Sequence, residues 1–140
     1  MNPPSREDVM RLSPLIVAAL IVMPSIAQAQ DVAAGEKVFA QCKTCHQIGE
    51  GAKNAVGPVL NGVIGRKAGT IEGFKYSEAN KNSGISWDEA TFADYIKNPK
   101  AKIPGTKMIY PGLKDEQKIK DLTAYLKQFD GQGHQVSQAK

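Results

Sequence analysis

Residues 42–46 read Cys-Lys-Thr-Cys-His, and this stretch holds both cysteines of the 140-residue chain. Two cysteines three residues apart at the end of a helix lie on the same side of it, and the histidine follows directly. The pattern C-x-x-C-H is typical of covalent haem attachment, in which the thiols form thioethers with the haem vinyl groups and the imidazole binds the iron. Cys42 and Cys45 are therefore predicted attachment residues, and His46 is a predicted axial ligand.

Three other chemistries use paired cysteines, and the surrounding sequence argues against each of them. A thioredoxin-like dithiol follows a β-strand in a βαβ unit, and this chain has no such alternation. A structural zinc site needs a fourth ligand and usually a second ligand pair, which the chain does not supply. A plain disulfide would leave His46 and the long loops described below unexplained.

The first 29 residues have the pattern of a cleavable export signal. Residues 15–23 form an apolar run that is too short to span a bilayer comfortably, and Ala27-Gln28-Ala29 supplies the small residues after which signal peptidase cuts. We therefore expect a mature chain that begins at Gln30 and is located in the periplasm. Acidic residues precede Met10 where a signal is usually basic, so Met10 is an alternative start. An uncleaved segment that tethers the protein to the membrane is the alternative to cleavage.

The mature chain is large enough for one domain and no more. We assign residues 30–130 to this domain and residues 131–140 to a flexible polar tail that lacks apolar periodicity. The formal charge of +4 is unchanged when residues 1–29 are removed, because that segment holds two basic and two acidic residues. Such a charge favours steering toward acidic partner surfaces and gives no indication of a nucleic-acid partner.

A six-coordinate haem iron needs a second axial ligand, and the mature chain offers Met108, its only methionine, and His134, its only other histidine. Met108 follows Pro104 and Gly105 in a stretch that can lie over a flat ligand, and it is not on an apolar helical face. His134 lies in the predicted tail, so Met108 is the predicted ligand. Ligation by His46 and Met108 raises the reduction potential and closes the iron to substrates, which favours electron transfer over catalysis.

Apolar residues at helical spacing predict helices near both ends of the mature chain. The first is expected over residues 32–42 and the last over residues 115–129, where Asp115 can cap the start. These two helices are expected to cross. A shorter helical turn is predicted over residues 77–82.

The middle of the chain is predicted to hold one more helix and long loops. Ser86 and Glu89 have the spacing of a capping box, which predicts a helix that begins there and ends before Pro99. Residues 47–75 and 100–114 are rich in Gly, Pro, Asn and Lys and show no period of two, so we expect no sheet. Loops this long need a shared apolar partner in a compact domain, and a large prosthetic group would provide one.

The sequence over residues 35–129 resembles the class I c-type cytochromes, the soluble bacterial relatives of mitochondrial cytochrome c. The resemblance implies a small all-α fold in which helices and long loops wrap around one covalently attached haem c. It covers nearly the whole mature chain and rests, besides the C-x-x-C-H motif, on the stretches Val56-Gly57-Pro58, Gly65-Arg66-Lys67-Ala68-Gly69, Gly73-Phe74-Lys75-Tyr76, Ala79-Asn80-Lys81-Asn82, Ile85-Ser86-Trp87, and Tyr95 through Asn98-Pro99 to Ile103-Pro104-Gly105-Thr106-Lys107-Met108.

The resemblance also implies roles for residues around the haem. The carbonyl of Pro58 is expected to accept the ring N–H of His46 and so to orient the imidazole. Haem propionates in an apolar pocket need hydrogen-bond donors, and the implied donors are Arg66, Tyr76 and Trp87. Three further residues are implied in a polar network beside Met108, namely Asn80, Tyr95 and Thr106.

By the same resemblance, the chain is an electron-transfer protein and not an enzyme. The implied donor is a membrane quinol:cytochrome c oxidoreductase, and the implied acceptors are a terminal oxidase, a nitrogen-oxide reductase or a photosynthetic reaction centre. The alternative is a haem peroxidase-like or gas-binding protein, which would need an open iron position, and Met108 argues against it. We expect a monomer that meets its partners through lysines near the exposed haem edge: Lys43, Lys53, Lys100, Lys107 and Lys114.

Overall fold

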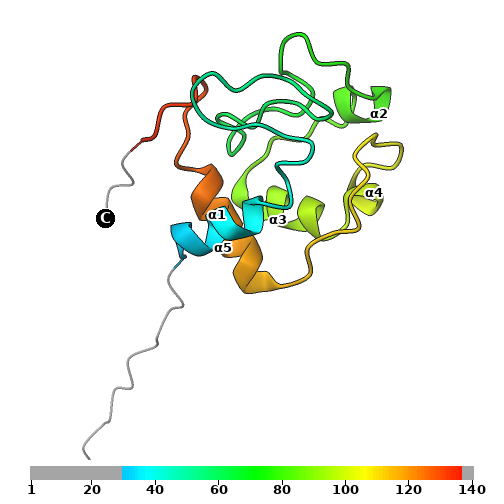
Figure 1. The fold of residues 1–140 in the computed structure, drawn as a ribbon. Helices are drawn as coiled ribbons and strands as arrows, with labels where there is room; N and C mark the ends of the chain where they lie inside the picture. The colour runs from blue at the N-terminus through cyan, green and yellow to red at the C-terminus, as the bar shows by residue number, and fades with distance from the viewer. Residues whose placement is uncertain (1–29, 137–140) are drawn as a thin grey trace, which may run out of the picture.

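Helices occupy the two ends and the middle of the domain, and loops make up the rest. The computed structural model describes residues 30–136, so the predicted export signal and residues 137–140 lie outside the described part. Figure 1 shows α1 and α5 crossing beneath a layer of long loops, with α2 and α4 beside those loops. Within the described part the helices are α1 (Val32–Phe39), α2 (Glu78–Lys81), α3 (Glu89–Lys97), α4 (Pro99–Lys102) and α5 (Glu116–Leu126).

The predicted helix starts are correct except for that of α3. Its cap is Asp88, whose carboxylate accepts a hydrogen bond from the Thr91 backbone amide over 2.8 Å. The expected cap Ser86 instead forms an isolated β-bridge with Lys67. A carboxylate two residues nearer the helix satisfies the same free N–H groups, and this leaves Ser86 available to pair with the loop.

The helix α4 lies where the sequence predicts a loop. Pro99 does end α3, but it also occupies the first turn of α4, where a missing N–H is tolerated. The Asn98 side chain caps α4 by accepting a hydrogen bond from the Ala101 amide over 3.2 Å. The same proline therefore separates two helices.

The predicted crossing of the first and last helices is confirmed, because α1 packs directly on α5. Gly35 sits at the closest point, and a side chain there would collide with the backbone carbonyl of Asp121 and with Tyr125. The buried Asp121 carboxylate accepts a hydrogen bond from the Asp31 amide over 2.9 Å, which fixes the start of α1 on α5. The crossing depends on a residue without a side chain.

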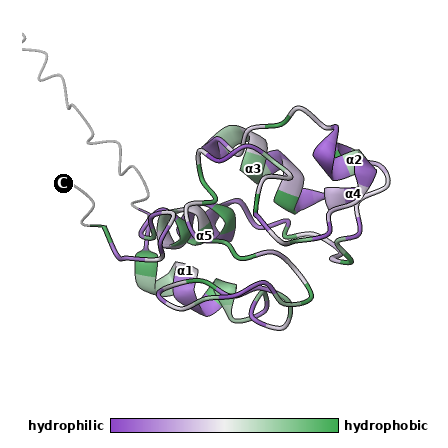
Figure 2. Cartoon of the chain, turned by 90° about the horizontal axis from the view of Figure 1, so that it is seen from above, coloured by the Kyte–Doolittle hydropathy of each residue, from purple (hydrophilic) through white to green (hydrophobic). Residues whose placement is uncertain are grey.

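The core lies where α5 packs against α1 on one side and α3 on the other. Phe39, Ile119, Leu122 and Leu126 are almost fully buried there. Figure 2 shows hydrophobic and hydrophilic residues on the same helices, as expected for helices with one buried face. None of the helices between residues 30 and 136 combines the length and apolar composition needed to cross a bilayer.

The expected absence of a sheet is confirmed for residues 30–136, which contain two isolated β-bridges and no strand ladder. One bridge joins Phe129 to Gln135 and forms part of a turn after α5. The Asp130 carboxylate accepts a hydrogen bond from the His134 amide over 2.9 Å, and the Val136 amide donates to the Gln128 carbonyl over 2.7 Å. The first residues of the predicted tail therefore pack against the domain.

Candidate haem-binding site

A cavity of about 510 Å³ opens between the helical core and the loops. The helices contribute apolar side chains to its wall, among them Phe39 from α1, Phe92 from α3 and Leu126 from α5. The turn after α1 contributes the C-x-x-C-H segment, and the segment between α4 and α5 contributes Met108. Such a volume with a mostly apolar wall and a few polar groups is typical of a cofactor site.

Both cysteine thiols line this cavity and neither forms a disulfide. Burial, with a smaller contribution from Cys45, raises the pKa of the Cys42 thiol to about 11. A catalytic or redox-active dithiol requires the opposite shift, because the thiolate is the reactive form. The raised pKa of Cys42 therefore argues against thiol exchange at this site.

The imidazole of His46 is held by its neighbours on the loop. Its Nδ1 atom lies 2.7 Å from the Pro58 carbonyl oxygen, so Nδ1–H donates and the Nε2 lone pair remains available. Burial lowers the pKa of His46, and this outweighs the Pro58 hydrogen bond, which raises it; the charge on Arg66 lowers it further. The ring is thus neutral at neutral pH, as a metal ligand must be.

Gly57 is a site residue to which sequence reasoning assigns no role. A side chain at this position would collide with the ring of His46, so the glycine allows the loop backbone to lie against the imidazole. Its only signal in the sequence is its place between Val56 and Pro58. The close approach depends on how the loop folds back and is not readable from local spacing.

Met108 lies within a small group of hydroxyls. The Tyr95 hydroxyl donates a hydrogen bond to the Met108 Sδ atom over 3.2 Å, and the Thr106 Oγ1 atom accepts one from the Met108 amide over 3.2 Å. The Tyr95 and Thr106 oxygens are 3.4 Å apart. Burial raises the pKa of Tyr95, although the Thr106 hydrogen bond lowers it, so the phenol stays protonated and donates.

Two polar atoms at the cavity wall are buried and have no hydrogen-bond partner among residues 30–136: Arg66 Nε and Asn80 Oδ1. The two terminal nitrogens of Arg66 donate to the carbonyls of Asn61 and Val59 over 2.7 and 3.2 Å, so Nε is the guanidinium nitrogen that is buried without a partner. An unpaired buried donor is unfavourable unless a ligand supplies the acceptor. A haem propionate would supply one to Arg66, and the residues present therefore fit this group.

Two further predicted propionate donors, Tyr76 and Trp87, also line the cavity. The Tyr76 hydroxyl accepts a hydrogen bond from the Ile71 amide over 3.2 Å, so its own hydrogen remains free to donate. The Trp87 ring packs on Tyr95 with centroids 4.7 Å apart.

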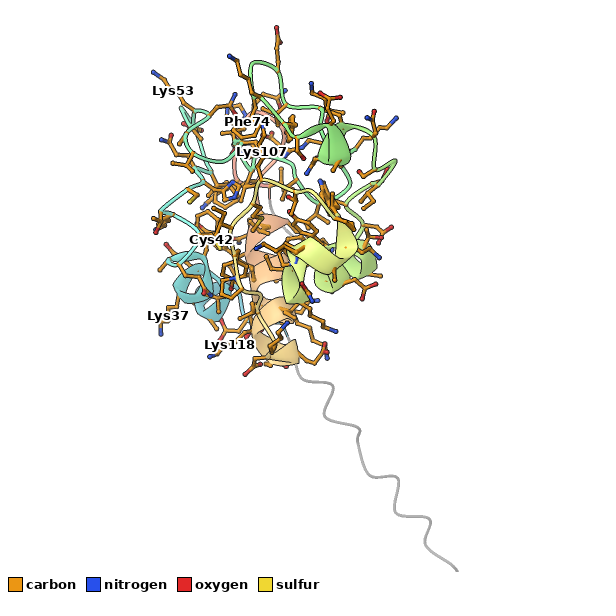
Figure 3. The ribbon with its side chains drawn as sticks, turned by 90° about the vertical axis from the view of Figure 1, so that its right-hand side faces the viewer. Lys37, Cys42, Lys53, Phe74, Lys107 and Lys118 are labelled. Carbon is orange, nitrogen blue, oxygen red and sulfur yellow. The ribbon has the colours of Figure 1, made fainter. Side chains whose placement is uncertain are left out.

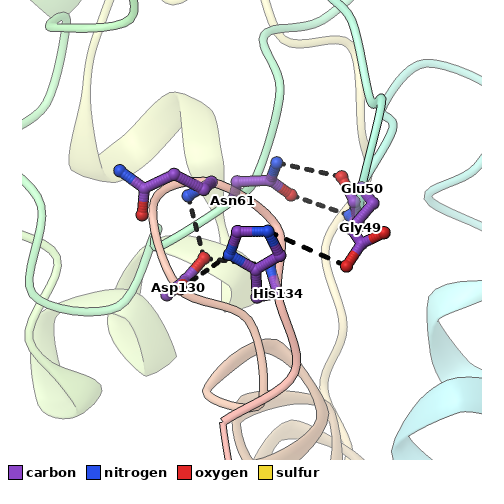
Figure 4. A network of polar contacts seen from close by, with 6 residues as sticks. Gly49, Glu50, Asn61, Asp130 and His134 are labelled. Atoms are coloured by element: carbon purple, nitrogen blue, oxygen red, sulfur yellow. Dashed lines mark hydrogen bonds and ion pairs between the residues drawn. The ribbon is translucent and has the colours of Figure 1, made fainter.

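The structure separates the two candidate second ligands, because His134 does not line the cavity. It lies on the turn after α5, where its Nδ1 is 3.4 Å from Asp130 Oδ2 and its Nε2 is 3.8 Å from Glu50 Oε1. Figure 4 shows this group next to the Asn61 side chain, which bonds to both the amide and the carbonyl of Gly49. Only Met108 shares the cavity with His46.

The predicted lysines differ in how they lie around the cavity mouth. Lys107 lines the cavity. In Figure 3, Lys53 and Lys107 lie above Cys42, whereas Lys37 and Lys118, which the sequence did not single out, lie below it on α1 and α5. Lys43 and Lys100 are exposed, whereas the Lys114 ammonium donates to the Lys97 carbonyl. Two apolar side chains at the same mouth are exposed: Val56 by 77% and Ile109 by 91%.

Comparison with known proteins identifies close relatives. The sequence profile of the family described as Cytochrome c matches residues 32–130. A cytochrome c2 of Blastochloris viridis is 66% identical over 119 residues, which cover 85% of this chain and 92% of that protein. The solved structure of cytochrome c2 from Rhodospirillum centenum superposes with a TM-score of 0.68 at 42% identity and covers 71% of this chain and 98% of the other. Cytochrome cH from Methylobacterium extorquens gives 0.65 at 50% identity, covering 69% and 97%.

Proposed function

This chain belongs to the cytochrome c family, and from that premise we propose that it shuttles single electrons between membrane redox complexes in the periplasm. It is an electron-transfer protein and not an enzyme, and it carries covalent haem c on Cys42 and Cys45, as the sequence predicts. The observation that supports the proposal best is the shared cavity, which brings the C-x-x-C-H segment and Met108 together.

We propose His46 Nε2 and Met108 Sδ as the two axial ligands. The bound haem supplies a one-electron iron couple, and a histidine–methionine pair favours a high potential with no open coordination position. Pro58 and Tyr95 act on the ligands themselves. The Pro58 carbonyl holds the imidazole in one tautomer. The Tyr95 hydroxyl orients the thioether through its hydrogen bond to sulfur.

The remaining polar residues of the cavity are proposed to hold the edge of the haem. Arg66 Nε is buried without a partner among residues 30–136, and Tyr76 and Trp87 line the same cavity, so these three can meet the propionates. The Thr106 Oγ1 atom accepts a hydrogen bond from the backbone amide of Met108 and so holds this residue in place. Asn80 offers a buried carbonyl oxygen that needs a donor, and we place it in the polar network beside Met108.

A quinol:cytochrome c oxidoreductase is the proposed donor, and a terminal oxidase, a nitrogen-oxide reductase or a photosynthetic reaction centre is the proposed acceptor. The partners are proposed to dock at the cavity mouth, where Lys107 and the exposed Val56 and Ile109 line the cavity, and Lys53 is proposed as a second basic contact. Basic side chains there favour acidic partner surfaces, and the apolar pair can be desolvated on contact.

Export is tested by the start of the mature protein. If signal peptidase cuts after Ala29, the protein isolated from the periplasm should begin at Gln30 or its cyclised form and carry the mass of one haem covalently. Mass spectrometry of the intact protein and of its N-terminal peptide measures both. Recovery of an uncut chain from the membrane fraction would instead support the tethered carrier.

Docking and function are tested together by reduction kinetics. The haem-loaded protein should be reduced by a purified quinol:cytochrome c oxidoreductase, and the bimolecular rate constant should fall as ionic strength rises. Lys107→Glu should slow this reaction several-fold at low salt and leave the reduction potential nearly unchanged, because the charge acts on encounter.

Lys120→Glu is the matched control, since Lys120 is an exposed residue of α5 that does not line the cavity. It carries the same change of charge and should affect the rate much less than Lys107→Glu. Rates that are equal in the two variants, or that do not change with salt, would argue for docking through apolar contacts alone. Failure to accept electrons at all would contradict the proposed function.

A further inference from the structure

The side chains of Gln41 and Tyr110 join two segments that are 69 residues apart in the sequence. The Tyr110 hydroxyl donates a hydrogen bond to Gln41 Oε1 over 3.1 Å, and both residues line the mouth of the haem cavity. Gln41 directly precedes Cys42, and Tyr110 lies two residues after Met108. The hydrogen bond therefore links the haem-attachment segment to the segment that carries the second proposed ligand.

We propose that this hydrogen bond is a strap that holds the Met108 segment closed over the cavity and so limits access of outside ligands to the iron. The strap rests on the ligation by Met108 proposed above. Gln41 and Tyr110 are positioning residues in this account, because they act on Met108 and not on the transferred electron.

The segment after the methionine has few other anchors. Among the residues that the structure describes, the hydrogen bond of Tyr110 is the only one made by residues 109–112. The chain is next fixed to the domain where the Leu113 amide donates to the Ile96 carbonyl over 2.8 Å. Ile109 adds little, since its side chain is 91% exposed. Between Met108 and Gly112, whose backbone lies against that of Lys97, the hydrogen bond of Tyr110 is therefore the polar contact that returns the chain to the described part of the domain.

The segment before the methionine is held differently. Thr106 and Tyr95 form hydrogen bonds with Met108 from within the domain. The side chain of Lys107 is exposed and adds no such contact. These contacts hold Met108 on one side, and they remain in place when the strap is removed. Loss of the strap should thus release one side of the segment without unfolding the domain.

The test measures how fast imidazole binds to the oxidised, haem-loaded protein, because imidazole must displace the methionine to reach the iron. Tyr110→Phe keeps the ring and removes the donor, and it should raise the binding rate constant about fivefold, as expected for one exposed neutral hydrogen bond. Gln41→Ala removes the acceptor and should have a similar effect. The double variant should be no faster than either single variant, since each change removes the same bond.

Tyr125→Phe is the matched control, because it makes the same chemical change in the contact between α1 and α5, away from Met108. It should leave the imidazole rate unchanged. In Tyr110→Phe the denaturant midpoint should stay close to that of wild type, which separates a strap from general destabilisation.

An unchanged imidazole rate in Tyr110→Phe, or effects of the two single variants that multiply in the double variant, would overturn the strap. The spectrum of the oxidised wild-type protein shows whether the strap alone is wrong or whether Met108 is not an iron ligand at all. If the methionine–iron charge-transfer band is missing before any substitution, the assignment of Met108 is wrong, and the strap falls with it. If the band is present and the rates are equal, only the strap is wrong.

Discussion

Replacing Met108 by alanine in the haem-loaded protein is expected to abolish the methionine–iron charge-transfer band and to lower the reduction potential by on the order of 0.1 V or more, since axial ligands tune haem over a range of about 0.8 V. The thioether stabilises the reduced iron, and alanine leaves a coordination position that small ligands can enter. Redox titration and the absorption spectrum of the oxidised protein measure the two effects.

The control is His134→Gln, because His134 is the other candidate from the sequence and lies outside the cavity. This variant should keep both the band and the potential. Peroxidase-like activity should appear in Met108→Ala and not in the control. Equal potentials for wild type and Met108→Ala would refute the assignment of the ligand and revive the peroxidase-like or gas-binding alternative.

Gly35→Ala is expected to destabilise the haem-loaded protein by about 3 kcal/mol, at the upper end of the usual effect of overpacking. The added methyl group would collide with the Asp121 carbonyl, which is backbone and cannot move away as a flexible side chain could. Alanine is the better helix former by about 1 kcal/mol, so the collision must outweigh that gain. Denaturant unfolding followed by circular dichroism measures the free energy.

Gly131→Ala is the matched control, since nothing lies within 4 Å of the added carbon and its backbone is not in the left-handed region. Its free energy of unfolding should change by less than about 0.5 kcal/mol. A similar small change in Gly35→Ala would show that α1 and α5 can separate without loss, and that the crossing is not required for stability.

The parts of the site that the sequence predicts are those set by local spacing or by elimination. Cys42 to His46 form one short motif whose chemistry depends on the order of five residues. Met108 is predicted because it is the only methionine of the expected mature chain, follows Pro104 and Gly105, and competes only with His134 in the expected tail. Both inferences rest on residue identity and on place along the chain, so neither requires the path of the loops.

The parts that the sequence does not predict depend on tertiary contacts or on competing local choices. Pro99 is read as the end of a helix, yet the same fixed backbone angle also begins α4. The contact of Gly57 with the His46 ring and the bond between Gln41 and Tyr110 arise only when distant segments meet. No local pattern marks these positions.

The cavity between the helices and the loops has a consequence for the cell that makes this protein. The apolar residues around it, among them Val63, Phe92 and Leu126, have the haem in common as a packing partner, so a chain that never receives the haem has a hollow interior. Such a chain populates open states more often, and proteases remove open chains continuously. The steady-state amount of this cytochrome should therefore follow the supply of haem for covalent attachment, even when transcription of its gene is constant.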